Sequence, residues 1–272
     1  MTQELYEKIR EKLRTLTGKK NIYLVERGNK AIWHALNYAH EQGFKEVSIQ
    51  DQGGWVTYEP YSVRLSLVVN TIPTDYGLFE GDFQDAVLLI NSMPGYASYL
   101  DTTKITVTNG LIINDVSGSI GTPQGKWGDI IVGSFGRWKP VNAGFGGFIA
   151  TDKGLNIEEF SFNENGLLTI IQKLEELPKR REFLVSTCAQ VKESLKQCTI
   201  IHPKHEGIVV IVKGDSHDSA HVLAFCDEFE FPYTICPRYI RITEPGVSIE
   251  VKRLDEADRE KPTETCEFIK QK

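Results

Sequence analysis

The sequence has few cysteines and no long apolar run. Its five cysteines are odd in number, far apart and confined to the last third of the 272 residues. They form no C-x-x-C pair, which argues against a disulfide framework and predicts a reducing, cytoplasmic compartment. No apolar run approaches the ~20 residues that cross a bilayer, so we expect no membrane association.

An excess of basic charge is also missing. The 37 acidic residues outnumber the 31 basic ones, for a formal net charge of −6, so nucleic acid is not an expected partner. The closest pair of candidate metal ligands, His202 and His205, lacks a matching second pair at short spacing. We therefore expect no metal. The apolar and charged fractions, 40% and 25%, are those of an ordinary globular protein.

Apolar periodicity predicts a large α/β domain over residues 1–199. A stripe of Leu5, Ile9 and Leu13 predicts an amphipathic helix over 3–16, which needs a surface on its own domain or on a partner subunit. Short runs, most of them continuously apolar, predict strands at residues 21–25, 46–49, 65–71, 85–91, 110–115, 129–135 and 147–151. Such runs are typical of a mostly parallel sheet covered by helices on both faces.

The remainder of the chain predicts a different organisation. Between residues 163 and 198 we expect two helices divided by Pro178, with Lys179-Arg180-Arg181 on a solvated face. A small α+β domain then occupies residues 200–272. Its expected elements are strands at 207–213, 233–236, 239–243 and 247–251 and a helix at 216–228.

Three features that could take part in binding or catalysis lie at or after the ends of predicted strands, where the loops of an open parallel sheet build ligand sites. Asp115 ends one strand, Lys139 follows another after a turn of small residues, and Gly28-Asn29 begins a helix whose free N–H groups suit a phosphate. The motif is not a P-loop, because Lys139 is followed by Pro140. Taken singly, each feature also fits a plain role as a turn aspartate, a solvated lysine or a helix cap.

The order of these features resembles the fold-type I pyridoxal-phosphate enzymes, most closely the DegT/StrS family of sugar aminotransferases. The resemblance rests on eight features in order: a helix start, an aromatic residue, a strand-end Asp, a Gly, a Gly-Asp, a Ser-Phe, a Lys and a Gly-x-Gly-Gly. These are Gly28-Asn29-Lys30-Ala31, Trp55, Asp115, Gly121, Gly128-Asp129, Ser134-Phe135, Lys139 and Gly144-Phe145-Gly146-Gly147.

The resemblance implies a role for each residue. Lys139 would bind pyridoxal 5′-phosphate covalently and shuttle the substrate proton, and Asp115 would pair with the pyridinium nitrogen. The phosphate would be held by Ser134, Gly28 and Asn29, and Trp55 would stack on the ring. Arg241, in a stretch similar to a strand that carries a substrate-binding arginine, would grip a substrate carboxylate; an exposed strand arginine is the alternative.

The function implied is an aminotransferase that moves an amino group between an amino acid and a keto compound, with a keto sugar as a candidate acceptor. A homodimer is implied as well. A pyridoxal-phosphate lyase or dehydratase remains an alternative. So does a binding or regulatory protein without catalysis, because Gly118 stands where the family has Gln or His and Phe145 where an acidic residue is common.

Overall fold

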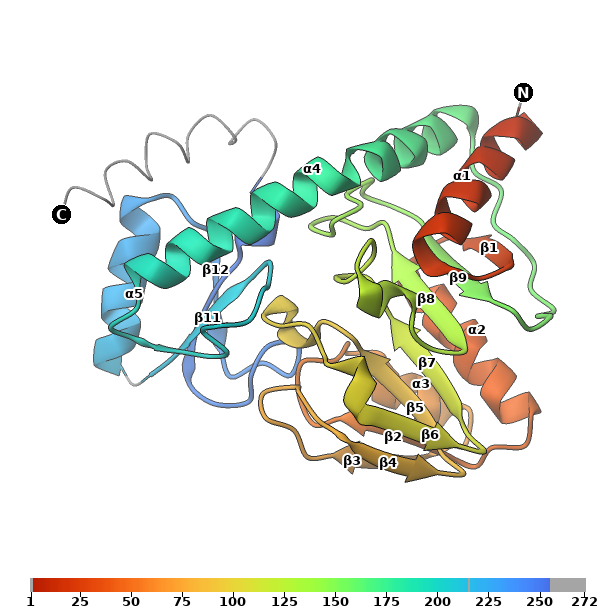
Figure 1. Ribbon diagram of the computed structural model, residues 1–272, viewed down its shortest axis with the longest axis horizontal. Helices are drawn as coiled ribbons and strands as arrows, with labels where there is room; N and C mark the ends of the chain where they lie inside the picture. Colours follow the sequence, from red (N-terminus) through yellow and green to blue (C-terminus); the bar gives the residue numbers. More distant parts are fainter. Residues whose placement is uncertain (1, 215, 255–272) are drawn as a thin grey trace.

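The computed structural model describes residues 2–214 and 216–254, in two sheets with covering helices and a short strand pair (Figure 1). The helices are α1 (Thr2–Thr17), α2 (Gly28–Glu41), α3 (Tyr58–Arg64), α4 (Glu164–Ser194) and α5 (Ser216–Glu228). The main sheet has the order β1-β9-β8-β7-β5-β2-β3. Its strands are β1 (Asn21–Val25), β2 (Glu46–Gln50), β3 (Val68–Ile72), β5 (Val87–Asn91), β7 (Leu111–Asp115), β8 (Ile130–Ser134) and β9 (Gly147–Thr151).

The main sheet confirms the predicted fold class. All its neighbouring strands pair in parallel except at β9, which runs antiparallel to both β8 and β1. Every residue of β5 and β9 is buried, as expected for strands covered on both faces. The α2 side chains pack on one face, in a cluster with strand residues such as Val47 and Val87. Side chains of α1 and α4 pack with Ile22, Ile131 and Phe148 in a separate cluster.

Helix α1 covers its own large domain. Ile9 and Leu13 are 0% exposed and share a cluster with Leu167, Ile170 and Leu174 of α4. Of the two surfaces that its apolar stripe could have covered, the structure therefore shows the one on the same chain. The homodimer stays a prediction, without support from this stripe.

The prediction of two helices divided by Pro178 is wrong. Helix α4 is one helix of 31 residues with Pro178 inside it, and Figure 1 shows it running from beside α1 to the small domain. Leu177 belongs to the core of the large domain and Leu184 to that of the small domain. Packing on both sides of the proline holds the helix together across the hydrogen bond that the proline removes.

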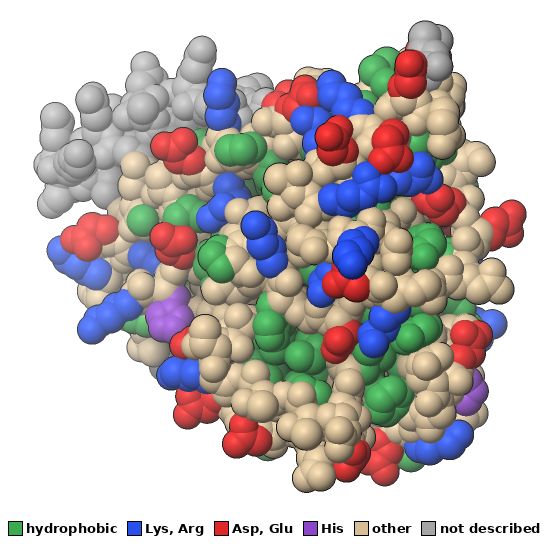
Figure 2. All heavy atoms as spheres, turned by 45° about the vertical axis from the view of Figure 1, so that its right-hand side comes forward, with side chains coloured by type: hydrophobic (Ala, Val, Ile, Leu, Met, Phe, Trp, Pro, Cys, Tyr) green, Lys and Arg blue, Asp and Glu red, His purple; other side chains and the backbone are tan. Residues whose placement is uncertain are grey.

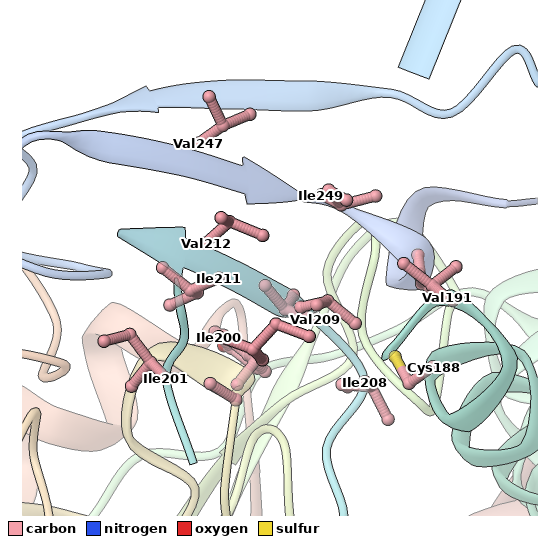
Figure 3. Close-up of a cluster of buried hydrophobic side chains, with 14 of the residues drawn as sticks. Cys188, Val191, Ile200, Ile201, Ile208, Val209, Ile211, Val212, Val247 and Ile249 are labelled. Atoms are coloured by element: carbon pink, nitrogen blue, oxygen red, sulfur yellow. The ribbon is translucent and has the colours of Figure 1, made fainter. Parts of the chain in front are cut away.

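The small domain is a four-stranded antiparallel sheet, in the order β10-β11-β13-β12, with α5 against it. Its strands are β10 (Thr199–Ile200), β11 (Val210–Lys213), β12 (Tyr233–Cys236) and β13 (Gly246–Ile249). Figure 3 shows Cys188 and Val191 of α4 beside the isoleucines and valines of this sheet. Packing of this domain thus begins within α4, before the predicted boundary at residue 200. Its residues beyond 254 lie outside the described part of the chain.

The predicted strand at 239–243 is also wrong, because the segment forms a loop that contacts the large domain. The amide of Arg238 donates to the Ile242 carbonyl, which closes a turn. The Tyr239 carbonyl accepts from the Gly53 amide at 2.7 Å. Its hydroxyl donates to the Gln50 carbonyl at 3.0 Å. Main-chain groups committed in this way are not available to a sheet, whatever the side-chain alternation.

Further elements were not predicted. Helix α3 ends at Arg64, so the strand expected from residue 65 begins only at Val68. Strands β4 (Gly81–Gln84) and β6 (Ile105–Thr108) form a separate parallel pair. Within the described ranges no helix is both long and apolar enough to span a bilayer. On the face in Figure 2, Lys and Arg side chains are interspersed with Asp and Glu, and hydrophobic side chains gather in its lower half.

The packing of α1 gives a stability prediction. Leu13→Ala should lower the free energy of unfolding by about 2–5 kcal/mol, because a fully buried leucine loses both transfer free energy and packing. Urea denaturation followed by circular dichroism measures this difference. The exposed neighbour Glu11→Ala is the matched control and should change stability by less than about 0.5 kcal/mol. Equal effects of the two variants would contradict the packing described for α1.

Candidate functional site

The ends of three adjacent strands bring the predicted site together. Asp115 ends β7, where it lies in register with Asn91 of β5 and Val132 of β8. Ser134 ends β8. Since neighbouring parallel strands end at one edge of the sheet, their terminal side chains share that edge. The predicted positions of Asp115 and Ser134 at strand ends are therefore what the structure shows.

Asp115 is a buried carboxylate with two hydrogen-bond donors. It is 6% exposed, its Oδ1 accepts from the Ser117 amide at 2.9 Å, and its Oδ2 accepts from the Tyr58 hydroxyl at 2.9 Å. Burial, followed by the charge of Asp115, raises the pKa of Tyr58 well above its ordinary value, so the phenol remains a donor. Each carboxylate oxygen keeps a lone pair for a further partner.

The start of α2 lies against Ser134. A Cβ on Gly28 would come within 2.7 Å of the Ser134 Cβ, so only glycine allows this approach. The residue before the helix is Arg27, in extended conformation and without a side-chain cap, so the expected alternative of an asparagine cap does not hold. A cavity of about 840 Å³ opens here, lined by Ser134 but not by Lys139 or Asp115. The arrangement places a hydroxyl beside a helix N-terminus, which suits an anion.

Two aromatic residues contact the Lys139 amine. Its Nζ lies 4.8 Å from the ring centroid of Trp55 and 4.7 Å from that of Tyr96, and it donates a hydrogen bond to the Tyr96 hydroxyl. The Trp55 indole N–H in turn donates to Asn29 Oδ1 at 2.7 Å. Predicted residues from the α2 start, the loop before α3 and the loop after β8 are thereby joined through direct contacts.

Backbone strain marks the same place. Tyr96 and Trp138 both have left-handed backbones, with φ of 62° and 64°. Bulky residues rarely adopt this conformation, which costs about 1–3 kcal/mol and is typical of functional sites. Trp138 directly precedes Lys139, and Tyr96 contacts the Lys139 amine. Strained residues therefore flank the lysine from two segments of the chain.

Arg241 lies near this group but has its carboxylate partner inside the protein. It is 3% exposed, and its Nε and Nη2 donate to the two Glu250 carboxylate oxygens at 2.8 and 2.6 Å. Its guanidinium carbon is 5.3 Å from the Tyr96 ring centroid. The alternative of an exposed strand arginine is wrong on both counts, because Arg241 is buried and in a loop. Its role toward a substrate stays a prediction.

A charge network surrounds Glu250, which is 0% exposed. Lys252 lies 3.4 Å and Arg253 3.6 Å from its Oε2. Burial alone would raise the pKa of Glu250, but the hydrogen bonds and charge of Arg241 lower it to about 2. Burial lowers the pKa of Lys252 to about 7, opposed by Glu250 and assisted by Arg241 and Lys139. Lys252 also approaches the Tyr96 ring, at 4.9 Å.

Arg180 connects the lysine loop to this network. The prediction of a solvated Lys179-Arg180-Arg181 face is wrong for Arg180, which is 3% exposed. From α4 it donates to the carbonyls of Lys139 at 3.4 Å and Lys252 at 3.1 Å. The central residue of the basic run thus binds main-chain carbonyls of two segments of the site and does not face solvent.

Sequence reasoning missed several residues of the site: Tyr58, Tyr96, Arg180, Glu250 and Lys252. A sequence signal existed for Tyr96. It lies in the turn-forming segment Met93-Pro94-Gly95-Tyr96, shortly after the continuously apolar strand β5, and loops that follow such strands carry the other candidate residues. Lys252 carried no such signal, because its burial depends on contacts between domains. Over the part of the chain that the structure describes, three or more His, Cys, Asp or Glu side chains nowhere form a group that could hold a metal ion.

Comparisons with known proteins support the fold. Residues 178–270 match the family described as the MJ1341 family C-terminal domain. A search of curated proteins gives no match. Among solved structures, a putative sugar aminotransferase from Streptococcus pneumoniae in its PMP form has a TM-score of 0.70 at 9% identity, covering 97% of this chain and 90% of that one.

Other similar structures are those of an aminotransferase and a dehydratase. An aspartate aminotransferase of subgroup IV from Thermus thermophilus has a TM-score of 0.69 at 14% identity, covering 99% of this chain and 91% of that one. A GDP-4-keto-6-deoxymannose-3-dehydratase with bound GDP-perosamine has a TM-score of 0.70 at 12% identity, covering 97% and 92%. The chain therefore has the fold of these enzymes, in agreement with the predicted fold-type I architecture.

The charge network gives a pH prediction for Lys252. Because its folded pKa of about 7 is below its unfolded value, the unfolded chain binds more protons above neutral pH, and stability rises with pH there. Relative to Lys252→Met, the wild type should gain about 2 kcal/mol between pH 6.5 and 8.5. Urea denaturation at both pH values measures this gain. The exposed Lys179→Met serves as the control. Parallel pH dependences of wild type and Lys252→Met would contradict the burial of this ammonium.

Proposed function

We propose that the protein is a pyridoxal-phosphate-dependent aminotransferase. The observation that carries the proposal is the Lys139 amine, in contact with Trp55 and Tyr96 in the loop after β8, together with Asp115 and Ser134 at the ends of adjacent strands. Similarity to solved aminotransferases supports it at the level of fold. The amino donor is an amino acid and the acceptor a keto compound, with a keto sugar as the candidate that the resemblance suggests.

The residues present fit this cofactor. Its phosphate requires a hydroxyl and main-chain amides, which Ser134 and the α2 start place together because Gly28 has no side chain. Its aldehyde requires an amine, and its ring requires a carboxylate and an aromatic surface. Lys139, the buried Asp115 and Trp55 supply these three groups. The proposed donor set is thus complete within one chain.

The roles of the side chains follow from their positions. When bound, the cofactor supplies an aldehyde for the amino group and a ring that takes up electrons. Ser134 Oγ and the first amides of α2 would hold the phosphate, and the Asp115 carboxylate would keep a proton at the ring nitrogen. The Tyr58 hydroxyl fixes that carboxylate through Oδ2. Lys139 would supply the amine to which the cofactor is attached, and it would take up and return the proton of the substrate carbon.

Substrate binding by Arg241 remains part of the proposal in a limited form. Its guanidinium would need to exchange Glu250 for a substrate carboxylate, and removing one partner of a buried pair leaves an uncompensated charge. The transferase function does not depend on this exchange. A homodimer and a cytoplasmic location are proposed with the function. Light scattering at micromolar concentration tests the dimer, and a stable species of 30.7 kDa would exclude it.

A cofactor-binding protein without transferase activity is the second candidate. Gly118 offers no side chain to a ligand, and Phe145, 38% exposed, lines the cavity beside Ser134. A lyase or dehydratase would share the cofactor and differ only in the bond broken. Incubation of the cofactor-loaded protein with a panel of amino acids separates these possibilities. Conversion of the cofactor to its amine form supports transfer, whereas an unchanged spectrum with every donor favours a binding protein.

The first test of the proposal is the identity of the modified lysine. After incubation with pyridoxal phosphate and reduction with borohydride, peptide mass spectrometry should find the cofactor on Lys139. Lys139→Ala should lose this attachment while keeping its fold, and Arg137→Ala, with an exposed side chain next to Trp138, should keep it. Attachment to Lys104 or Lys126 instead would show that the site is misplaced, and a colourless protein that takes up no cofactor would refute the function.

Asp115→Asn should have a different effect from Lys139→Ala. The cofactor still binds through Ser134 and the α2 start, but the ring nitrogen loses its anionic partner. Loss of a positioned charge that stabilises developing charge costs about 10²–10³-fold in rate. Stopped-flow absorbance of the reaction with an amino acid should therefore show a large decrease in rate at nearly unchanged cofactor affinity. A variant that reacts as fast as the wild type would remove Asp115 from the proposed mechanism.

A further inference from the structure

Tyr96 contacts the Lys139 amine from a segment that the sequence did not single out. Its hydroxyl accepts a hydrogen bond from Nζ, and Nζ lies 4.7 Å from its ring centroid. The residue is 4% exposed and belongs to the hydrophobic core of the small domain. Tyr96 therefore contacts the lysine while its own side chain packs in the core of the small domain.

The loop after β5 fixes the backbone of Tyr96. The amides of Ile208 and Val209, which precede β11, both donate to the Tyr96 carbonyl, at 2.9 and 3.0 Å. A Cβ on Gly207 would lie 2.3 Å from the Ala97 carbonyl oxygen, so this junction between domains admits only glycine there. The backbone of Tyr96, with its left-handed φ, is thereby held in place from the small domain.

The loop after β7 leaves room for the ring of Tyr96. A Cβ on Gly118 would lie 2.8 Å from the Tyr96 Cδ1 and 2.9 Å from its Cε1. Gly118 has no positive φ, so its lack of a side chain is explained by the ring rather than by backbone conformation. A side chain at position 118 would thus compete with the Tyr96 ring, and with the Met93 sulfur at 2.9 Å, for the same space.

The small domain also surrounds the ring with charge. Lys252 Nζ lies 4.9 Å and the Arg241 guanidinium carbon 5.3 Å from the ring centroid, in addition to Lys139. Both small-domain cations share the buried carboxylate of Glu250. Attraction between cations and the face of an aromatic ring contributes most where the groups are desolvated. Tyr96 therefore links the charged groups of the small domain to the amine of the large domain.

We propose that Tyr96 is a positioning residue for Lys139, whose hydroxyl holds the lysine amine in the site and whose ring couples that amine to the small domain. The proposal deepens the proposed function, on which its catalytic meaning rests. The contacts themselves do not require the cofactor. Displacement of Tyr96 should release the amine from its acceptor and from its place between the two rings.

The test measures the reactivity of the Lys139 amine directly. The full chain is treated with hydroxylamine to free any lysine bound as an imine, then labelled with sulfosuccinimidyl acetate between pH 6 and 10. Peptide mass spectrometry gives the labelling rate at Lys139. Tyr96→Phe keeps the ring and removes the hydroxyl. Because the amine then loses the acceptor that holds it in place, it should become more accessible to the reagent, and the labelling rate at Lys139 should rise at least threefold.

Tyr76→Phe is the control for loss of a tyrosine hydroxyl elsewhere: the Tyr76 hydroxyl accepts from Lys213 Nζ at 2.8 Å, beside the Glu244 carboxylate that also pairs with Lys213. It should alter labelling at Lys213 and leave Lys139 as in the wild type. Gly118→Ala is the second variant, used also if Tyr96→Phe fails to fold, because its methyl group pushes the Tyr96 ring away. The charged side chains near Lys139, those of Lys252, Arg241, Arg253 and Glu250, are unchanged in every variant, and the titration of Lys252 near pH 7 is common to all of them.

The proposal is overturned if folded Tyr96→Phe is labelled at Lys139 as the wild type is. If Tyr96→Phe does not fold, unchanged labelling in Gly118→Ala overturns it. Faster labelling at Lys139 in both variants, with no change in Tyr76→Phe, supports it. This outcome is separate from the proposed function, because labelling is measured without added cofactor. A protein that never binds pyridoxal phosphate at Lys139 would refute the function while the labelling result still decided the role of Tyr96.

Discussion

Burial of both faces of the parallel sheet is the constraint on which the rest of the structure depends. Strands such as β5 have no exposed residue, so polar groups with a chemical role have no place along them. They are found at the strand ends, where Asp115 and Ser134 lie, and in the loops that follow, which carry Tyr96 and Lys139. The same hydrophobic burial that stabilises the sheet thus concentrates the candidate site at one edge.

Two devices join this edge to the small domain. Helix α4 packs its first half on the large domain and its second half on the small one, so the two cores share a rigid element. From the middle of this helix, Arg180 donates to carbonyls of the Lys139 loop and of Lys252. The loop carrying Tyr96 makes the second connection through the amides before β11. The position of the lysine therefore depends on both domains.

Local signals predicted the fold class and most strands of the main sheet. Continuous apolar runs located the strands, and the positions of Asp115 at a strand end and of Lys139 in the loop after a strand needed no long-range information. Local sequence patterns predicted the wrong secondary structure where tertiary contacts determined the conformation. Pro178 lies inside a helix because two cores hold it, and the alternating segment at 239–243 is a loop because its main chain bonds to the large domain. Tyr58 and Lys252 were missed since only folding brings them to the site.

The charge network in the small domain is better explained by position than by stability. Desolvation of Glu250 and its cations consumes much of their attraction, and apolar residues of similar volume often stabilise as much or more. Apolar residues at these positions would not orient charged groups toward the Tyr96 ring. Arg241 and Lys252 are each held by Glu250 and each lie within 5.3 Å of the Tyr96 ring centroid. A carboxylate fixed in the core thereby orients two cations onto the ring that contacts Lys139.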